Sequence, residues 1–371
     1  MKRFSSIFSL LFLALSCIYP YEVQETYGDS VNVVVDGSIV VGKSADLTLG
    51  LMNTKEAGYQ YSSVRPDEWW VEDNQGTKYS PVSNTSRTVN LTSAPGDRAY
   101  RMVVKYSGKT YSSSFENCAE PPVITGITFD DSGYSVNCRV SLEEKSAGSG
   151  YVALSYEEMW KFHTQFMDSY FITETDQGWY VLARPEPDTT RYWCWRYSSS
   201  NSETLVDMTH LNGVAKDYRF YTFAKSSDRN HGFYHIKVHA RSISEAEYRF
   251  RKNLETTVVG YNLFTPNPGE IAGNLRCEED ESVRVFGYVT LSVLSSREAQ
   301  LDDRYLYTIP RDPEDFIEIK QKEIPYYYYD MNFRPLYEEP GEDMGVHIMW
   351  GPMRCVDCVA DGGSLTQPSF R

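Results

Sequence analysis

Cys17 follows Ser16 at the end of an apolar run, a position where the thiol of an exported protein can be acylated. Lys2 and Arg3 give the chain a positive start, and the apolar run 7–15 is too short to span a bilayer. This pattern indicates a secretory signal, and a cysteine after small residues is typical of a bacterial lipoprotein signal. We therefore expect residues 1–16 to be removed and residues 17–21 to form a lipidated tether. The alternative is an ordinary signal in which Cys17 is discarded.

Cys355 and Cys358 have a spacing that suits half of a zinc site, a redox pair or a disulfide. A zinc site would need two more ligands, and the sequence has no second C-x-x-C. A redox pair would need a helix N-terminus to lower a thiol pKa, and the Gly362-Gly363 loop predicts none. We therefore predict a Cys355–Cys358 disulfide that closes a tight loop. The pairing stays open for the remaining cysteines, which are Cys118, Cys138, Cys194 and Cys277.

A serine hydrolase site and a metal site are both disfavoured. Gly28-Asp29-Ser30 resembles the nucleophile block of GDS-type esterases, and His210 with Asp207 resembles their distal pair. Such a serine should leave a buried parallel strand and enter a helix, whereas Ser30 precedes an alternating strand beside the tether. We therefore expect no catalytic residues.

Three histidines share one face of a predicted strand. They lie four residues apart, about 13 Å along a strand, which is too far for one ion. We expect no metal site at these histidines, which are His231, His235 and His239.

Aromatic residues make up 14% of the chain and gather in short runs. Trp69-Trp70 and the pair Trp193 and Trp195 suit either sugar stacking or the core and edge of a sandwich. A run of four tyrosines lies in an acidic, proline-rich segment between residues 309 and 345, where a loop could bind a partner. These possible contact residues are Tyr326, Tyr327, Tyr328 and Tyr329.

The formal charge of −15 and the pI near 4.9 argue against nucleic-acid binding, which requires a basic face. Short alternating strands with frequent turns predict an all-β fold of antiparallel, immunoglobulin- or fibronectin-like sandwiches. Asp36-Gly37 predicts an early hairpin turn. We expect an N-terminal sandwich over 22–119 and a larger β-domain over 120–371.

Two short helices should interrupt the second domain. Capping-box patterns that start at Ser155 and Ser244 predict them near 155–170 and 244–256. In the first, Met159, Phe162 and Phe166 follow at helical spacing.

Two stretches carry a family resemblance. The first runs from Ser242-Ile243-Ser244 through Leu263-Phe264 and Gly273-Asn274 to Val289, and the second runs from Cys355-Val356-Asp357-Cys358 to Phe370. Together with the signal, they resemble the Bacteroidota lipoproteins grouped as domain of unknown function 4249. The resemblance covers nearly the whole mature chain.

This resemblance implies an outer-membrane lipoprotein, often encoded beside a TonB-dependent transporter, with no known ligand. Ile18-Tyr19-Pro20-Tyr21 stands before the first acidic residue, Glu22, so both the cell surface and the periplasmic face stay open. We expect a non-enzymatic accessory to such a transporter in nutrient capture or uptake, without a cofactor. The alternative is a surface glycan-binding module.

Acylation of Cys17 gives the first prediction. Metabolic labelling with a fatty acid should mark the wild-type protein and not Cys17→Ala, because two or more acyl chains anchor a protein stably. Equal labelling of both proteins would contradict a lipid anchor at this residue.

Overall fold

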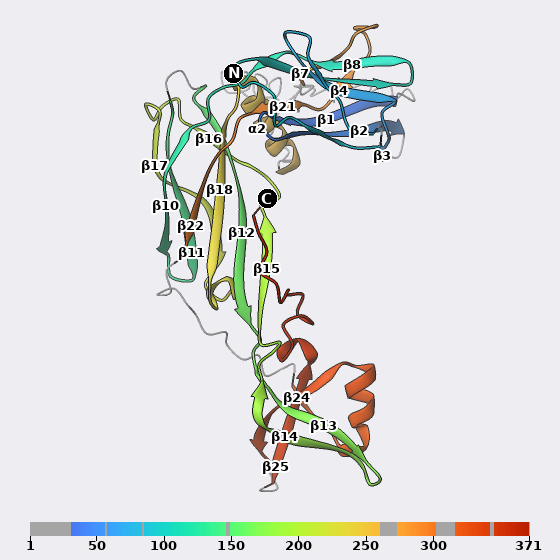
Figure 1. Ribbon diagram of the computed structural model, residues 1–371, viewed down its shortest axis with the longest axis vertical. Helices are drawn as coiled ribbons and strands as arrows, with labels where there is room; N and C mark the ends of the chain where they lie inside the picture. The colour runs from blue at the N-terminus through green and yellow to red at the C-terminus, as the bar shows by residue number, and fades with distance from the viewer. Residues whose placement is uncertain are drawn as a thin grey trace, which may run out of the picture.

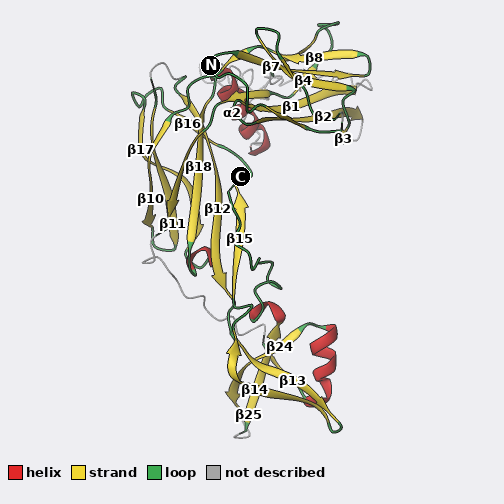
Figure 2. Cartoon of the chain, viewed as in Figure 1, coloured by secondary structure: helices red, strands yellow, loops and turns green. Residues whose placement is uncertain are grey.

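The computed structural model describes residues 31–55, 58–83, 85–145, 149–259, 273–301, 316–341 and 345–370. These residues form three β-rich bodies in a bent column: the first lies across one end of the central body, and the third lies at the other end (Figure 1). Strands dominate throughout, and α2 (Glu245–Val259) is the long helix beside the first body (Figure 2). The predicted all-β class is confirmed.

The first body is a sandwich of two sheets. One has the order β20-β1-β2-β3, with β21 beside β1 and β6 beside β2. Its strands are β1 (Val31–Val40), β2 (Ser44–Lys55), β3 (Gly58–Ser63), β6 (Thr88–Asn90), β20 (Val285–Phe286) and β21 (Val289–Ser292). The other has the order β19-β8-β7-β4-β5, with β9 beside β7. Its strands are β4 (Glu68–Asp73), β5 (Lys78–Tyr79), β7 (Ala99–Tyr106), β8 (Lys109–Ser113), β9 (Glu116–Asn117) and β19 (Leu275–Cys277).

Three late strands complete this sandwich, so it does not end at residue 119 as expected. β20 and β21 pair in parallel with β1, and β19 pairs with β8. Cys277, Val289 and Leu291 are buried in the same core as Val35 and Trp69. The chain therefore leaves the first body after β9 and returns to it after α2.

The central body packs two antiparallel sheets face to face. The smaller sheet is β10-β11-β17 and the larger is β15-β12-β18-β22, with β16 also on β12. Their strands are β10 (Val123–Asp131), β11 (Ser135–Glu143), β17 (Val214–Ala224), β12 (Tyr151–His163), β15 (Trp193–Ser199), β16 (Thr204–Asp207), β18 (Tyr234–Ser242) and β22 (Ser295–Gln300). Val136, Val140, Leu154, Phe162 and Ile236 belong to the core between them.

The third body combines a hairpin inserted between β12 and β15 with strands that follow β22 in the chain. Its hairpin joins β13 (Asp168–Thr175) to β14 (Gly178–Asp188). A three-stranded sheet in the order β23-β25-β24 packs against this hairpin. Its strands are β23 (Ile317–Glu318), β24 (Phe333–Pro340) and β25 (Val346–Pro352).

The helix predicted near 155–170 is wrong, because these residues form most of β12 and the start of β13. β12 is a central strand that pairs with β15, β16 and β18. It buries side chains on both faces, including Met159 on one and Trp160 with Phe162 on the other. Burial on both faces brings apolar residues to every spacing, so the helical spacing of Met159, Phe162 and Phe166 was coincidental.

The helix predicted near 244–256 is confirmed as α2. The Ser244 hydroxyl accepts the backbone N–H of Glu247 at 3.1 Å, as a capping box requires. Within the described ranges, no helix is long and apolar enough to cross a membrane.

Gly287 lies between β20 and β21 and gives the second prediction. It has a φ of +105°, and a Cβ there would lie 2.0 Å from the carbonyl oxygen of Val35 in β1. Gly42 also has a positive φ, of +81°, but nothing lies within 4 Å of its Cβ position. We expect Gly287→Ala to lower the free energy of unfolding by more than about 3 kcal/mol, and Gly42→Ala by about 1 kcal/mol. Chemical denaturation measures both, and equal losses would contradict the close approach at Gly287.

Candidate functional site

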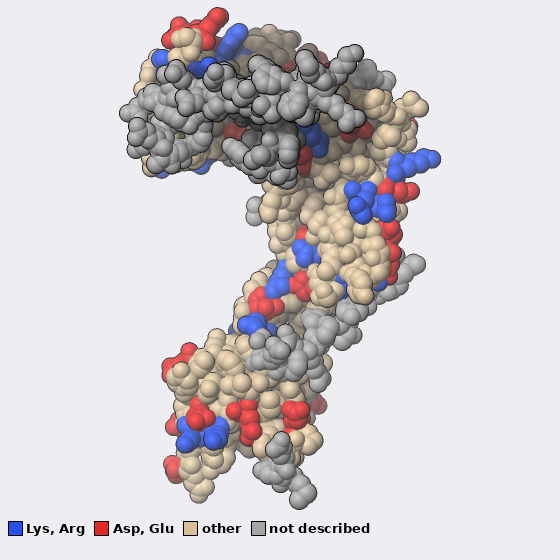
Figure 3. Space-filling model, turned by 180° about the vertical axis from the view of Figure 1, so that it is seen from behind, with Lys and Arg blue, Asp and Glu red and all other residues tan. Residues whose placement is uncertain are grey.

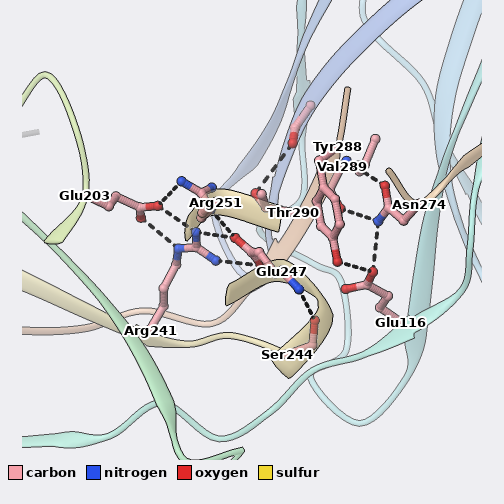
Figure 4. A network of polar contacts seen from close by, with 11 residues as sticks. Glu116, Glu203, Arg241, Ser244, Glu247, Arg251, Asn274, Tyr288, Val289 and Thr290 are labelled. Carbon is pink, nitrogen blue, oxygen red and sulfur yellow. Dashed lines mark hydrogen bonds and ion pairs between the residues drawn. The ribbon is translucent and has the colours of Figure 1, made fainter. Parts of the chain in front are cut away.

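A buried network of ion pairs joins the central sheet to α2, as Figure 4 shows. Arg241 of β18 donates to both carboxylate oxygens of Glu203, at 2.8 and 2.6 Å, and to both of Glu247, at 3.2 and 2.6 Å. Arg251 lies on α2 and pairs with the same two carboxylates, each at 2.8 Å. Two positive and two negative charges therefore balance where little water enters, since the side chains of Arg241 and Glu247 are 5% and 1% exposed.

The pKa of Glu203 shows that its ion pairs outweigh the effect of its burial. Burial alone would raise the pKa of its carboxyl group. Hydrogen bonds and charge from Arg241, with charge from Arg251, oppose burial and hold this pKa below its ordinary value. Glu203 is therefore ionised at neutral pH, as the network needs.

A second polar cluster lies beside the network and belongs to the first body (Figure 4). Glu116 of β9 accepts hydrogen bonds from the Asn274 amide at 2.8 Å and the Tyr288 hydroxyl at 3.3 Å. The Asn274 amide also exchanges hydrogen bonds with the backbone of Val289, at 2.8 and 2.9 Å. The Tyr288 ring contacts Phe250 of α2, with ring centroids 4.9 Å apart. α2 is thus held by the central body on one side and by the first body on the other.

We call these residues together the upper joint: Glu116, Glu203, Arg241, Ser244, Glu247, Phe250, Arg251, Asn274, Tyr288 and Val289. Most of them lie in the first of the two stretches that carry the family resemblance, from residue 242 to about residue 290. This stretch is therefore explained by how it holds two bodies together. Residues 260–272 of the same stretch lie outside the described residues.

The predicted Cys355–Cys358 disulfide is wrong, because Cys358 is bonded to Cys194 of β15, with their Cα atoms 5.6 Å apart. The backbone N–H of Cys358 donates to the carbonyl oxygen of Arg191 at 2.9 Å. This bond holds the terminal segment beside β15. The Cys355 side chain instead packs in an apolar cluster with Phe166 and Leu336 of the third body.

Ion pairs support this disulfide, and we call the assembly the lower joint. Asp357 accepts from Arg191 at 2.8 Å and from the backbone N–H of Val359 at 2.9 Å. Arg196 pairs with Asp361 at 2.8 Å and with Asp228. The lower joint comprises Arg191, Cys194, Arg196, Asp228, Asp357, Cys358 and Asp361, and it ties the C-terminal segment to the central sheet at the end nearest the third body.

The predicted tyrosine contact forms one π-helical turn, Tyr326–Asp330, on the third body. Tyr326 and Tyr329 are 54% and 65% exposed, whereas Tyr327 packs against Phe333 and the Arg334 guanidinium lies 4.3 Å from the centre of the Tyr328 ring. Two of the four rings therefore hold the turn in place and two are open to a partner. Trp179 of the neighbouring hairpin lies at 87° to Tyr329, 5.6 Å away.

The predicted strand histidines have separate environments. His235 and His239 lie on β18 and each faces a carboxylate, Glu298 at 3.4 Å and Glu157 at 2.8 Å respectively. His231 precedes the strand, and burial lowers its pKa to about 4. In the part of the chain that the structure describes, no three His, Cys, Asp or Glu side chains are placed to hold a metal ion.

Two residues with predicted chemistry, Cys17 and Ser30, lie outside the described residues. Of the described members of the esterase pattern, Asp207 is the last residue of β16 and His210 follows the strand. Asp207 accepts the backbone N–H of Thr209 at 2.9 Å, a local turn contact.

Charged side chains of both signs lie side by side over the face in Figure 3, which shows no broad basic patch among the described residues.

Glu247 gives the third prediction. We expect Glu247→Gln to lower the free energy of unfolding by about 3–5 kcal/mol, because it leaves Arg241 and Arg251 with a single carboxylate, Glu203, and so one positive charge of the network uncompensated. Glu245→Gln is a matched control on the same helix: Glu245 also pairs with an arginine four residues on, but both side chains are more than half exposed. The control should lose less than about 1 kcal/mol in chemical denaturation. Similar losses for both variants would contradict a stabilising upper joint.

No curated protein sequence matches the chain. A family model described as a domain of unknown function, DUF4249, matches residues 18–298, which is more than half of the chain. The match spans both the first body and the upper joint. The chain therefore belongs to the DUF4249 family.

Proposed function

We propose that this protein is a lipid-anchored outer-membrane protein that assists a TonB-dependent transporter in nutrient capture or uptake. The observation that carries this proposal is the exposed aromatic pair Tyr326 and Tyr329 on the body farthest from β1. A tether that ends at Cys17 would enter the structure at β1. The third body would then project away from the attachment point.

The aromatic turn has the properties of a protein contact. Tyrosine supplies a large, amphipathic contact area with few rotatable bonds and is enriched at interface hot spots. Tyr327 and Tyr328 are already packed against the third body, so the turn would lose little conformational freedom on binding. Anchoring of both proteins in one bilayer raises their effective concentration, so a weak contact suffices.

A cleft beside β15 favours glycan binding as a second candidate function. The cleft has a volume of about 490 Å³, and its wall includes Trp195, Tyr197, Ser364, Thr366 and Gln367. Aromatic rings beside hydroxyl and amide groups suit a sugar, which has apolar ring faces and polar edges. Trp193, on the same strand, is 38% exposed.

The transporter contact gives the fourth prediction. Cross-linking in intact cells, followed by affinity capture of this protein, should recover a TonB-dependent transporter. The double variant Tyr326→Ser with Tyr329→Ser should weaken this recovery at least several-fold, because it removes both exposed rings of the turn. Tyr134→Ser is the matched control, since Tyr134 is 93% exposed in a turn of the central body.

Capture of no transporter, under conditions that preserve a known transporter–lipoprotein pair, would contradict the proposed function. Equal recovery with the double variant and the control would keep the partner but exclude the turn as the contact.

A further inference from the structure

Three polar side chains form a continuous row across three strands of the larger central sheet. The Ser296 hydroxyl of β22 lies 2.7 Å from Nδ1 of His239 on β18. Nε2 of His239 lies 2.8 Å from Oε1 of Glu157 on β12. The other oxygen of Glu157 accepts the Tyr197 hydroxyl of β15 at 2.7 Å, which fixes the carboxylate. The row thus connects a hydroxyl, an imidazole and a carboxylate in sequence.

The strand register accounts for the short distance between serine and histidine. His239 and Ser296 are direct partners across β18 and β22. Leu301 donates its backbone N–H to the carbonyl oxygen of Tyr234, so these two residues form a hydrogen-bonded pair of the ladder. Hydrogen-bonded pairs recur at every second residue along β18. The His239–Ser296 pair therefore occupies a non-hydrogen-bonded position. Side chains approach most closely at such non-hydrogen-bonded positions.

The same alternation directs the backbone N–H of Ser296 away from β18. β22 is the edge strand of its sheet, with β10 near it but not paired to it, and no described residue accepts this N–H. A backbone donor next to the hydroxyl is where a serine hydrolase stabilises the negative oxygen of its tetrahedral intermediate.

The environments of the three residues suit different roles. Ser296 is exposed, whereas His239 and Glu157 are only 7% and 8% exposed. Burial lowers the pKa of His239 and outweighs the opposing effect of Glu157, so the imidazole is neutral at pH 7. Glu157 accepts a hydrogen bond from the N–H at Nε2, which leaves Nδ1 without a proton as the base that faces the serine. An accessible nucleophile therefore stands before a buried, oriented base.

We propose that Ser296, His239 and Glu157 form an acyl-transfer site for carboxylic esters. The Ser296 oxygen bonds to the ester carbonyl carbon while its proton moves to Nδ1 of His239. The ester C–O bond then breaks, and the alcohol leaves with that proton. A water molecule then bonds to the carbonyl carbon of the acyl-serine while its proton moves to Nδ1 of His239. The bond between this carbon and the Ser296 oxygen breaks, the serine oxygen takes the proton back, and the carboxylic acid is released.

Within this site, Ser296 is the nucleophile and His239 is the general base and acid. Glu157 is a positioning residue that holds the imidazole through the contact with Nε2. Nδ1, not Nε2, faces the serine, the reverse of the usual serine hydrolase, but the roles depend only on which nitrogen carries the proton. This activity goes beyond the proposed transporter role and does not rest on it.

Labelling with a fluorophosphonate probe tests the site without a known substrate, because the probe reacts with activated serines. The mature wild-type protein should form an adduct that peptide mass spectrometry locates at Ser296. Ser296→Ala should abolish the adduct, and His239→Gln should slow labelling at least about 100-fold. Ser282→Ala is the control: Ser282 bonds to Asp280 at 2.6 Å but has no histidine partner in the described part of the chain, so labelling should not change.

Glu157 needs a readout that separates positioning from folding. Glu157→Gln should slow labelling at least about 10-fold without loss of the thermal transition, and Glu157→Asp should restore part of the rate. Because Ser296 is exposed, Ser296→Ala should fold normally even if the buried variants do not. A wild-type protein that forms no adduct at Ser296, or labels no faster there than His239→Gln, would overturn the proposal.

Discussion

The buried charge of Arg241 is the constraint on which the arrangement of the bodies depends. A guanidinium that is 5% exposed must be compensated, and its two carboxylates come from α2 and from the segment before β16. Loss of either partner would leave a buried charge at a cost of about 3–5 kcal/mol. Because Phe250 of the same helix contacts Tyr288 of the first body, the charge balance in the central sheet also places the sandwich above it.

The family-specific stretches lie apart from the exposed tyrosines and the Ser296 row, although the second stretch supplies Ser364, Thr366 and Gln367 to the cleft beside β15. The segment from 242 to 290 builds the upper joint, and the terminal cysteine segment builds the lower joint, where Cys358 bonds to Cys194 across 164 residues. The exposed tyrosines and the Ser296 row lie on surfaces that these joints hold in position. Rigid elements that present functional groups are the usual arrangement in proteins that bind or catalyse at their surface.

Local patterns in the sequence predicted the elements that depend on local physics. Alternation predicted the all-β class and the strand that carries His235 and His239, which is β18, and the capping box at Ser244 predicted α2. Asp36-Gly37 was wrongly predicted as a turn: Gly37 lies inside β1, where a side chain would meet Met102 of the facing sheet. The Cys194–Cys358 bond and the Glu157–His239–Ser296 row join residues far apart in the chain, so no local spacing encodes them.

Small-angle X-ray scattering of the intact protein in solution tests the central claim, that two joints hold three bodies in one bent arrangement. The account predicts a scattering profile that fits the single arrangement in Figure 1, at every protein concentration that is free of association. A profile that requires a broad mixture of relative orientations of the bodies would contradict it.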